Sequence, residues 1–397
     1  MNNTNPNLSI VDEHDDIKSQ MSSPIIDSSA APSPQSQATV AGIAKVVPKA
    51  DDLVSRANIE ERDTPIPAHK QTILQKLRSS RKLHIKHRFE DKDENDNLSC
   101  KFICHTFWAT QFQALRSIFL DEDTDEGFIR SLAQSASWNA QGGKSGASFS
   151  KSQDGRFVVK CISKTELQMF LDIALEYFKY LADSYVYKKP TVLCKIIGIY
   201  QVGYHNKISG KKVMEQVVVM ENVFHNRNIT RVFDLKGSSR ARYTATEATE
   251  DFDSLLLKRR EARASKLFLP RRNNSQQVLM DDNLMELTKG QPFPLKFLAN
   301  NYLQKAIEND TDYLLNVNIV DYSILVGIDE DNFEIVVGII DYMRQYDIIK
   351  RVERMGKSVG MIAGQAEPTI IQPSQYKRRF RIAMERNFMG VPDKYDF

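Results

Sequence analysis

A single lysine interrupts an apolar strand in the first half of the chain, at Phe157-Val158-Val159-Lys160. A largely apolar strand is buried in a sheet, so the ammonium group of Lys160 needs an anion beside it. A Gly/Ser loop, Gly142 to Phe149, comes directly before the strand, and small residues there let backbone N–H groups approach a polyphosphate. Together the two features predict a phosphate site. Taken alone, the loop could equally be a hairpin turn, and the lysine could reach solvent from an edge strand.

The loop contains Gly143-Lys144-Ser145, but the P-loop pattern needs a glycine at the position of Trp138, which disfavours a P-loop NTPase. A helix with apolar residues at 3-4 spacing follows the strand, and Glu166 lies near its start. In kinases, a lysine of this kind contacts the α- and β-phosphates of ATP and pairs with a glutamate of the next helix. Glu166 is therefore the expected partner of Lys160.

Two aspartates stand next to the strands of a later predicted hairpin. Asp321 comes just before the first strand, and Asp341 ends the apolar run Val336 to Ile340. An acid at the end of an apolar strand is costly unless it binds something. Phosphoryl transfer uses one carboxylate to orient the attacking hydroxyl and another to hold Mg²⁺. A helix cap is the ordinary role of a single aspartate, but the pair favours the chemical role.

A third cluster is Asp234-Leu235-Lys236-Gly237-Ser238, followed by Arg240 and Arg242. Three cations around a tight turn could hold a phosphate. By itself such a cluster is also typical of a solvated basic loop.

Composition divides the chain into three parts. Residues 1–65 are rich in Asn, Ser, Asp, Pro, Gln and Ala with almost no aromatic residues, which predicts disorder. Residues 66–97 are basic and then acidic, and we interpret them as a linker with a marginal helix. Residues 98–397 carry the patterns of a folded domain, with a charged insertion at about 246–277 and a basic loop at about 342–372.

Strand and helix patterns are mixed along this domain, which predicts an α+β fold. We expect strands near residues 101–108, 156–162, 194–204, 212–220, 229–235, 322–328 and 333–340, and helices near 112–119, 128–132, 164–182, 294–309 and 374–389.

Net charge and cysteine content restrict which binding partners and which cellular compartment we expect. The formal net charge is only +3, which gives no reason to expect nucleic acid. Four cysteines without disulfide-like spacing indicate a reduced, intracellular protein, and Cys100, Cys104 and His105 on one strand are more typical of a core than of a zinc site. The apolar runs are too short to cross a bilayer, so any membrane contact is expected to be peripheral.

Taken together, the motifs resemble the phosphatidylinositol phosphate kinase family over roughly residues 100–395. The segments that carry the resemblance are Met220 to Phe224, Asp234 to Ser238 and Asp321 to Gly327. The resemblance implies a two-lobed phosphatidylinositol phosphate kinase fold, distantly similar to protein kinases, with an antiparallel sheet plus helices in each lobe. The lobes would cover residues 98–224 and 225–397, and the cofactors would be ATP and Mg²⁺.

The resemblance also assigns roles to single residues. Asp321 and Lys236 would be catalytic, and Asp341 would hold the metal. Residues of three kinds would surround the nucleotide: the loop residues Gly143, Ser145 and Gly146, the pair Lys160 and Glu166, and the adenine-pocket residues Asn222 and Val223. Arg242 and the loop residues Lys350 and Arg351 would contact the lipid headgroup or the anionic bilayer.

Within the family, several segments, including Trp138 to Phe149 and Val391-Pro392-Asp393, look like the PIKfyve-type branch, which converts phosphatidylinositol 3-phosphate to the 3,5-bisphosphate. The chain departs from this branch at Ile348-Ile349, where a Trp-Asp pair is usual. A phosphatidylinositol 4-phosphate 5-kinase, and a nucleotide-binding membrane scaffold without catalysis, are therefore retained as alternatives. The expected location is the cytoplasm, peripheral on endosomal or vacuolar membranes, with a scaffold protein or the basic loops supplying the targeting. A protein kinase is disfavoured because its His-Arg-Asp and Asp-Phe-Gly motifs are missing.

Overall fold

The computed structural model describes residues 45–46, 66–92, 98–120, 125–138, 147–238, 242–244, 277–329, 334–347 and 371–392, with only the backbone described for 45–46. All of them belong to one unit, Val40–Phe397. The predicted disordered region, the charged insertion and the basic loop lie almost entirely outside the described residues.

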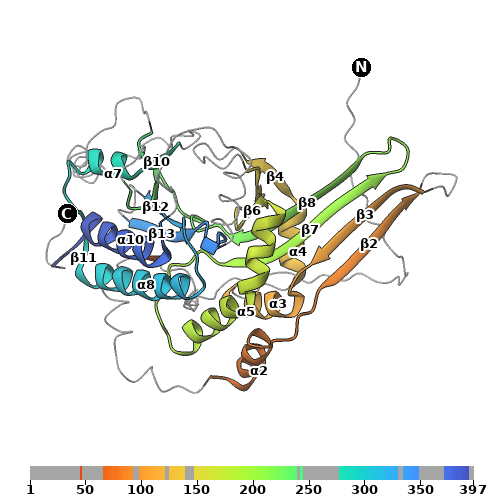
Figure 1. Ribbon diagram of the computed structural model, residues 1–397, viewed down its shortest axis with the longest axis horizontal. Helices are drawn as coiled ribbons and strands as arrows, with labels where there is room; N and C mark the ends of the chain where they lie inside the picture. Colours follow the sequence, from red (N-terminus) through yellow and green to blue (C-terminus); the bar gives the residue numbers. More distant parts are fainter. Residues whose placement is uncertain are drawn as a thin grey trace, which may run out of the picture. The chain divides into compact units, whose positions relative to one another are not determined.

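The first lobe is built on a fully antiparallel sheet in the order β2-β3-β7-β8-β6-β5-β4 (Figure 1). Its strands are β2 (Ile85–Lys92), β3 (Leu98–Thr106), β4 (Ser135–Trp138), β5 (Phe149–Ser152), β6 (Phe157–Ile162), β7 (Ile196–Asn206) and β8 (Lys212–Glu221). Strand β6, which carries Lys160, pairs with β8 on one side and β5 on the other. Lys160 is therefore not on an edge strand.

The long helix α5 (Lys164–Val186) packs against this sheet through an aromatic face that includes Phe170, Tyr177 and Phe178. It begins with a capping box, in which the Ser163 hydroxyl accepts the Glu166 N–H and the Glu166 carboxylate accepts the Ser163 N–H. The short helices α3 (Ala109–Phe119) and α4 (Asp125–Ala133) complete the first lobe. Their aromatic residues belong to the same core cluster as α5.

The described structure begins earlier than the sequence analysis expected. Helix α2 (Ala68–Leu77) contacts α3 and α5, and Leu74 and Leu77 are buried in the core. Strand β2 pairs along its whole length with β3. Residues 66–92 are therefore part of the packed lobe and not a linker. The alternation that identifies a half-buried strand is missing from β2 because every one of its side chains is exposed.

The second lobe contains a five-stranded sheet in the order β1-β13-β12-β9-β10. Its strands are β1 (Lys45–Val46), β9 (Arg231–Leu235), β10 (Val278–Met280), β12 (Ser323–Asp329) and β13 (Glu334–Ile340). The sheet is mixed, because β10 runs parallel to β9 while the other pairs are antiparallel. An antiparallel sheet was expected in each lobe, and the parallel pair β9–β10 is the departure from it in the second lobe.

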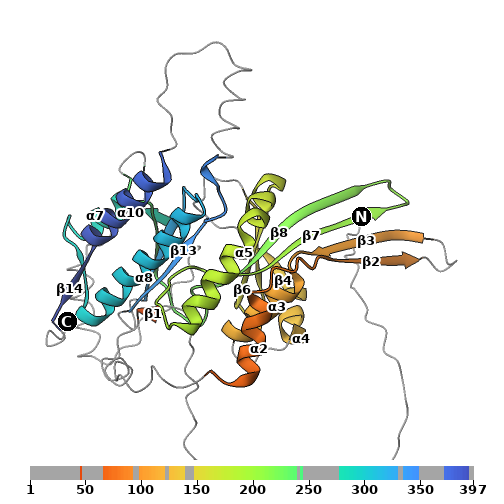
Figure 2. The same ribbon diagram turned by 60° about the horizontal axis from the view of Figure 1, so that its bottom comes forward.

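Helices and a small second sheet cover the second lobe. They are α7 (Asp281–Leu287), α8 (Phe297–Asn316), α10 (Pro373–Asn387) and the parallel pair β11 (Phe293–Lys296) and β14 (Phe388–Val391). Helices α8 and α10 lie side by side (Figure 2). The two-lobed α+β architecture expected from the sequence is confirmed.

The segment after β8 is anchored on the second lobe by two glycines. A Cβ at Gly338 of β13 would lie 2.8 Å from the Val223 side chain, and one at Gly327 of β12 would lie 2.5 Å from the Phe224 ring. A side chain at either position would therefore push the connecting segment away from the sheet. The glycines allow the connection between the lobes to dock directly on the strands that carry the candidate site.

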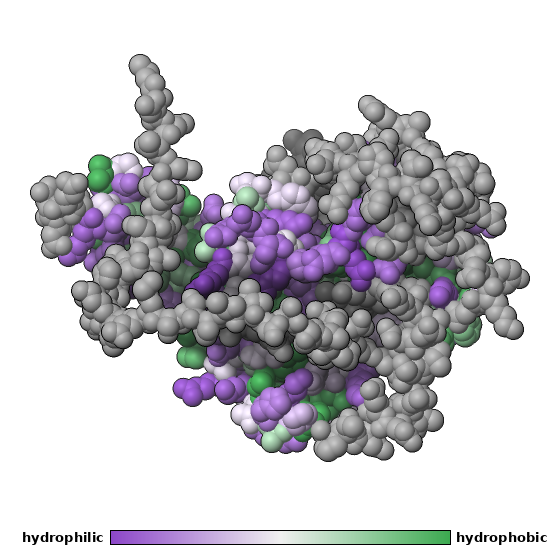
Figure 3. All heavy atoms as spheres, turned by 180° about the vertical axis from the view of Figure 1, so that it is seen from behind, coloured by the Kyte–Doolittle hydropathy of each residue, from purple (hydrophilic) through white to green (hydrophobic). Residues whose placement is uncertain are grey.

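The surface seen from behind carries mainly hydrophilic side chains in its described middle part, with smaller hydrophobic areas near its lower edge (Figure 3). Among the described residues, no helix combines the length and the apolar character that a bilayer crossing requires.

Candidate active site

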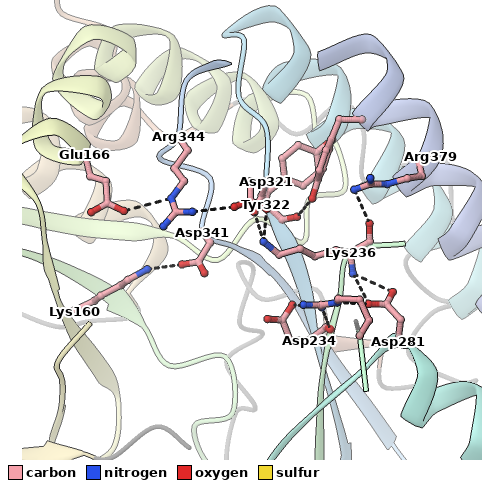
Figure 4. A network of polar contacts seen from close by, with 12 residues as sticks. Lys160, Glu166, Asp234, Lys236, Asp281, Asp321, Tyr322, Asp341, Arg344 and Arg379 are labelled. Atoms are coloured by element: carbon pink, nitrogen blue, oxygen red, sulfur yellow. Dashed lines mark hydrogen bonds and ion pairs between the residues drawn. The ribbon is translucent and has the colours of Figure 1, made fainter. Parts of the chain in front are cut away.

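The hairpin β12–β13 brings Asp321 and Asp341 to the same end of the second sheet. Ser323 pairs with Ile340, so Asp321, two residues before β12, and Asp341, the residue after β13, lie close to each other at that end. Both aspartates have left-handed backbone conformations, with φ of 64° for Asp321 and 61° for Asp341. This conformation is uncommon outside glycine and is tolerated best by Asn and Asp. The two turns aim both carboxylates into the space between the lobes (Figure 4).

Lys160 meets Asp341 across the contact between the lobes. Its Nζ lies 2.6 Å from Asp341 Oδ1, and the lysine is buried while the aspartate side chain is 40% exposed. The phenyl ring of Phe149 lies next to the same ammonium group. The anion that the apolar strand required is therefore a carboxylate of the other lobe.

Lys236 is paired with Asp321. Its Nζ donates to Asp321 Oδ1 at 2.6 Å and to the Asp321 carbonyl at 2.8 Å. Asp281, at the start of α7, accepts the N–H groups of Lys236 and Gly237 and holds their turn in place. Gly237 has a φ of 65°, and a Cβ there would lie 2.6 Å from Ala383 of α10. Only glycine suits this turn, because it needs both the conformation and the close approach.

Arg344, three residues after Asp341, bridges the two lobes. Its Nη1 donates to Asp321 Oδ2 at 2.9 Å, and its Nε lies 3.6 Å from Glu166 Oε1. With Lys236 on the other carboxylate oxygen, both oxygens of Asp321 accept a hydrogen bond from a cation (Figure 4).

Glu166 is not the partner of Lys160 in this structure. One of its oxygens, Oε2, accepts the Ser163 N–H of the capping box at 2.9 Å, and the other faces Arg344. Lys160 pairs with Asp341 instead. Both residues still line the same cleft. The signal for the observed role was the Ser-x-x-Glu spacing at the start of the helix, which is the signature of a capping box.

Arg242 is placed differently from the headgroup contact that the sequence analysis expected. It is buried, with its Nε donating to Asp281 Oδ2 at 2.8 Å and its Nη2 donating to the Asp234 carbonyl and, at 3.2 Å, to the Asp234 carboxylate. Burial alone would lower the pKa of its guanidinium, but the hydrogen bond to Asp281 and the charge of Asp234 raise it. The ion pairs of Arg242 with these two carboxylates therefore help to hold the turn that contains Lys236.

Asn222 and Val223 are buried beside the cleft, with their side chains engaged elsewhere. The Asn222 amide donates to the Gly155 carbonyl at 2.6 Å, and Val223 packs in a small core with Val232 and Val336. The apolar wall of the cleft comes instead from Ile196, Val218 and Met220, and its charged end from Lys160, Glu166, Asp341 and Arg344. An apolar wall next to a cationic end suits a nucleotide base and its phosphates.

Five predicted site residues lie outside the described residues. They are Gly143, Ser145 and Gly146 of the Gly/Ser loop and Lys350 and Arg351 of the basic loop.

Two residues of the site were missed in the sequence analysis. Asp281 directly follows the apolar strand Val278-Leu279-Met280, the same signal that identified Asp341. Arg344 has no comparable signal, because only the packing of the lobes brings it between Glu166 and Asp321.

The arrangement matches the needs of phosphoryl transfer. It offers one exposed carboxylate held by two cations and a second carboxylate, Asp341, with a buried lysine. Mg²⁺ is usually bound by one or two carboxylates together with substrate phosphates. Asp341 fits this requirement, because its side chain is 40% exposed and, among the described residues, only its Oδ1 is engaged.

Several curated proteins are similar to this chain. The 1-phosphatidylinositol-3-phosphate 5-kinase FAB1A of Arabidopsis thaliana is 40% identical over 330 residues, which cover 82% of this chain and 17% of that protein. The 1-phosphatidylinositol 3-phosphate 5-kinase of Homo sapiens is 36% identical over 313 residues, 79% of this chain and 14% of the human protein. The 1-phosphatidylinositol 3-phosphate 5-kinase FAB1 of Saccharomyces cerevisiae is 34% identical over 338 residues, which cover 82% of this chain and 13% of the yeast protein. The chain thus spans less than a fifth of the length of these relatives.

A family model described as Phosphatidylinositol-4-phosphate 5-Kinase matches residues 132–335 and 330–387. The match includes Lys160, Lys236, Asp321 and Asp341, the two ion pairs at the centre of the site. The chain therefore belongs to the phosphatidylinositol-4-phosphate 5-kinase family.

Proposed function

We propose that the protein transfers the γ-phosphate of ATP to the 5-hydroxyl of phosphatidylinositol 3-phosphate and forms phosphatidylinositol 3,5-bisphosphate. The observation that carries this proposal is the pair of aspartates at one end of the β12–β13 hairpin, each paired with a lysine from a different motif. The activity for which the Arabidopsis, human and yeast relatives are named supports the choice of substrate.

In the proposed mechanism, Asp321 accepts a hydrogen bond from the ring hydroxyl and orients it for in-line attack on the γ-phosphorus of ATP. As the new oxygen–phosphorus bond forms, the hydroxyl proton passes to Asp321 and the bond to the leaving ADP breaks. Lys236, already 2.6 Å from Asp321, holds this carboxylate in place and would stand beside the transferred phosphoryl group. Asp341 would hold Mg²⁺, which would supply positive charge against the phosphates of ATP. Lys160 would then exchange Asp341 for the α- and β-phosphates.

The residues of the Gly/Ser loop, Gly143, Ser145 and Gly146, are proposed to cover the ATP phosphates. Lys350 and Arg351 are proposed to contact an anionic membrane, since cations next to a lipid-binding site are attracted to anionic headgroups. The protein would act peripherally on endosomal or vacuolar membranes from the cytoplasm, and a scaffold protein could add to the targeting.

Phosphatidylinositol 4-phosphate is the second candidate substrate, because the matching family model is described by that lipid. The test uses vesicles that contain phosphatidylinositol, its 3-phosphate or its 4-phosphate, with purified protein, labelled ATP and Mg²⁺, and resolves the products by chromatography. We expect the 3,5-bisphosphate as the main product. A faster reaction with the 4-phosphate would overturn the substrate assignment, and transfer to a peptide but to no lipid would overturn the lipid kinase proposal.

A further inference from the structure

Arg344 is the weakly held cation on the catalytic carboxylate. Lys236 makes two short contacts with Asp321 and its side chain is 20% exposed. Among the described residues, the Arg344 guanidinium donates one hydrogen bond of 2.9 Å, its second ion pair is long at 3.6 Å, and its side chain is 41% exposed. Exposed ion pairs of this kind are worth little. Arg344 can therefore leave Asp321 at a small cost in free energy.

Asp321 is more open to a substrate hydroxyl when one of these two cations leaves. Both of its carboxylate oxygens accept a hydrogen bond from a cationic side chain, Oδ1 from Lys236 and Oδ2 from Arg344. Each oxygen has a second lone pair, so a hydroxyl can bind beside the donor, and the departure of a donor frees a further acceptor site. Because Lys236 is held twice and is more buried, the donor that gives way is Arg344.

A phosphate monoester is the ligand that best attracts a guanidinium away from a carboxylate. Arginine binds phosphate through two parallel hydrogen bonds, and the phosphate carries more charge than a carboxylate. Arg344 lies between the two sides of the site: its shorter contact is with Asp321 and its longer one is with Glu166. Lys160, the lysine proposed to bind the nucleotide phosphates, pairs with Asp341 instead. A phosphate on the same ring as the attacking hydroxyl would come close to Arg344 when that hydroxyl reaches Asp321.

The other arginine expected near the headgroup is not available for this role. Arg242 is buried between Asp234 and Asp281, which balance its charge. Among the described residues, the cations that contact Asp321 are Lys236 and Arg344. Lys236 is held on Asp321 by two contacts, so of these two cations Arg344 is the one that can turn toward a headgroup phosphate.

We propose that Arg344 recognises the phosphate monoester of the lipid headgroup, and that the phosphate releases Asp321 Oδ2 for the substrate hydroxyl by drawing the guanidinium away. This inference rests on the proposed lipid kinase function. It makes Arg344 a specificity-determining residue, since a lipid without a ring phosphate would leave the guanidinium on Asp321.

The test compares Arg344→Gln and Arg344→Lys with the wild type on vesicles that contain phosphatidylinositol or its 3-phosphate. For Arg344→Gln we expect the KM for the 3-phosphate lipid to rise roughly 10- to 100-fold, the scale of one lost charge-assisted contact. The KM for ATP should stay within about twofold, and the preference for the phosphorylated lipid over phosphatidylinositol should fall by the same factor as the KM rises. Arg344→Lys keeps the charge and should recover part of the effect.

A matched control is Arg130→Gln, which changes an arginine of α4 that is 79% exposed and also paired with a carboxylate. It should leave all these values unchanged. A rise in the KM for ATP in Arg344→Gln would assign the guanidinium to the nucleotide, and an equal loss on both lipids would give Arg344 only a structural role. Either result, or no change at all, overturns the inference.

Binding of soluble inositol 1,3-bisphosphate and inositol 1-phosphate, measured by calorimetry, separates this inference from the proposed function. A wild type that turns over neither lipid would overturn the proposed function. If the wild type binds the bisphosphate more tightly than the monophosphate and Arg344→Gln loses the difference, the recognition site stands. If the wild type shows no difference between the two compounds, the recognition site is wrong, whatever lipids are phosphorylated.

Discussion

Two regions at the contact between the lobes are each centred on an aspartate, and they differ in every partner. Asp321 has a side chain that is 43% exposed and accepts hydrogen bonds from two cations, Lys236 and Arg344. Asp310 of α8 is fully buried and accepts hydrogen bonds from the Tyr180 and Thr191 hydroxyls and, at 2.7 Å, from the Val192 N–H. The first region is charged, and a substrate can replace its cationic partners. The second region joins α8 to α5 and to the segment after α5.

The difference shows that the hydrogen-bond partners of a carboxylate determine whether its role is structural or chemical. Burial raises the pKa of Asp310 to about 6, although the hydrogen bonds from Thr191 and Tyr180 act in the opposite direction. A carboxyl group surrounded by neutral donors in the core has a structural role. A half-exposed carboxylate on a left-handed turn, held by cations of which one is exposed, can exchange that partner for a substrate.

Among the variants that test this difference between Asp321 and Asp310, Asp321→Asn is expected to have the largest effect, a loss of kcat. Asparagine keeps the size and tolerates the positive φ but removes the charge. We expect kcat for lipid phosphorylation to fall by roughly 10³-fold, on the scale of a general base, with ATP affinity and the melting temperature unchanged. The control is Asp172→Asn, an exposed aspartate of α5. Unchanged turnover in Asp321→Asn would show that the role of Asp321 is as structural as that of Asp310.

A smaller effect, on stability, is expected for Arg242→Met. This change keeps the apolar stem and leaves Asp234 and Asp281 without their cation in a buried place. The free energy of unfolding should fall by about 3 kcal/mol, because breaking a buried pair leaves uncompensated charge. Urea unfolding measures this loss, and the KM for lipid should stay within about twofold.

Arg386→Met, at an exposed position of α10, should change the free energy of unfolding by less than about 0.5 kcal/mol and serves as the control. If Arg242→Met keeps its stability but raises the KM for lipid tenfold or more, Arg242 belongs to the region around Asp321, where a substrate can replace the partners of a charged group. Arg242 would then have a role in substrate binding and not in stability.

The smallest effect concerns the pH dependence of Asp310. Its pKa is raised from 3.8 in the unfolded chain to about 6 in the folded protein, so the folded state holds the proton more tightly. The contribution of the neutral carboxyl to stability is complete below about pH 4 and is lost as the pH rises through 6. Compared with Asp310→Asn, the wild type should lose about 1 kcal/mol of unfolding free energy between pH 5 and 7.

Urea unfolding of both proteins across this pH range gives the difference directly, and the other titrating groups cancel. In Asp310→Asn, the new side chain would offer its carbonyl oxygen to the Val192 N–H and its amide to the two hydroxyl oxygens, so the variant is expected to fold. A difference that does not change between pH 5 and 7 would show that Asp310 stays ionised in the core.

Much of the site could be predicted from local sequence because strand ends are visible there. Lys160 in an apolar strand and Asp341 directly after one are unusual enough to indicate buried or functional charge, and both lie in the cleft. Helix α5 and the strands β7, β8, β12 and β13 were predicted within a few residues, because their apolar periodicity is strong. Strand β2 was missed, because all of its side chains are exposed and no pattern marks it.

The sequence by itself determined which charges stand at the ends of strands and turns: Lys160, Lys236, Asp321 and Asp341. Only the tertiary structure decided which charge meets which. Lys160 pairs with Asp341, 181 residues away, while the nearer Glu166 is used by its own capping box. Arg242 is buried between two carboxylates, and Arg344 forms an ion pair with Asp321. Periodicity records the environment of each residue along its own element, whereas an ion pair over such separations depends on how the lobes pack.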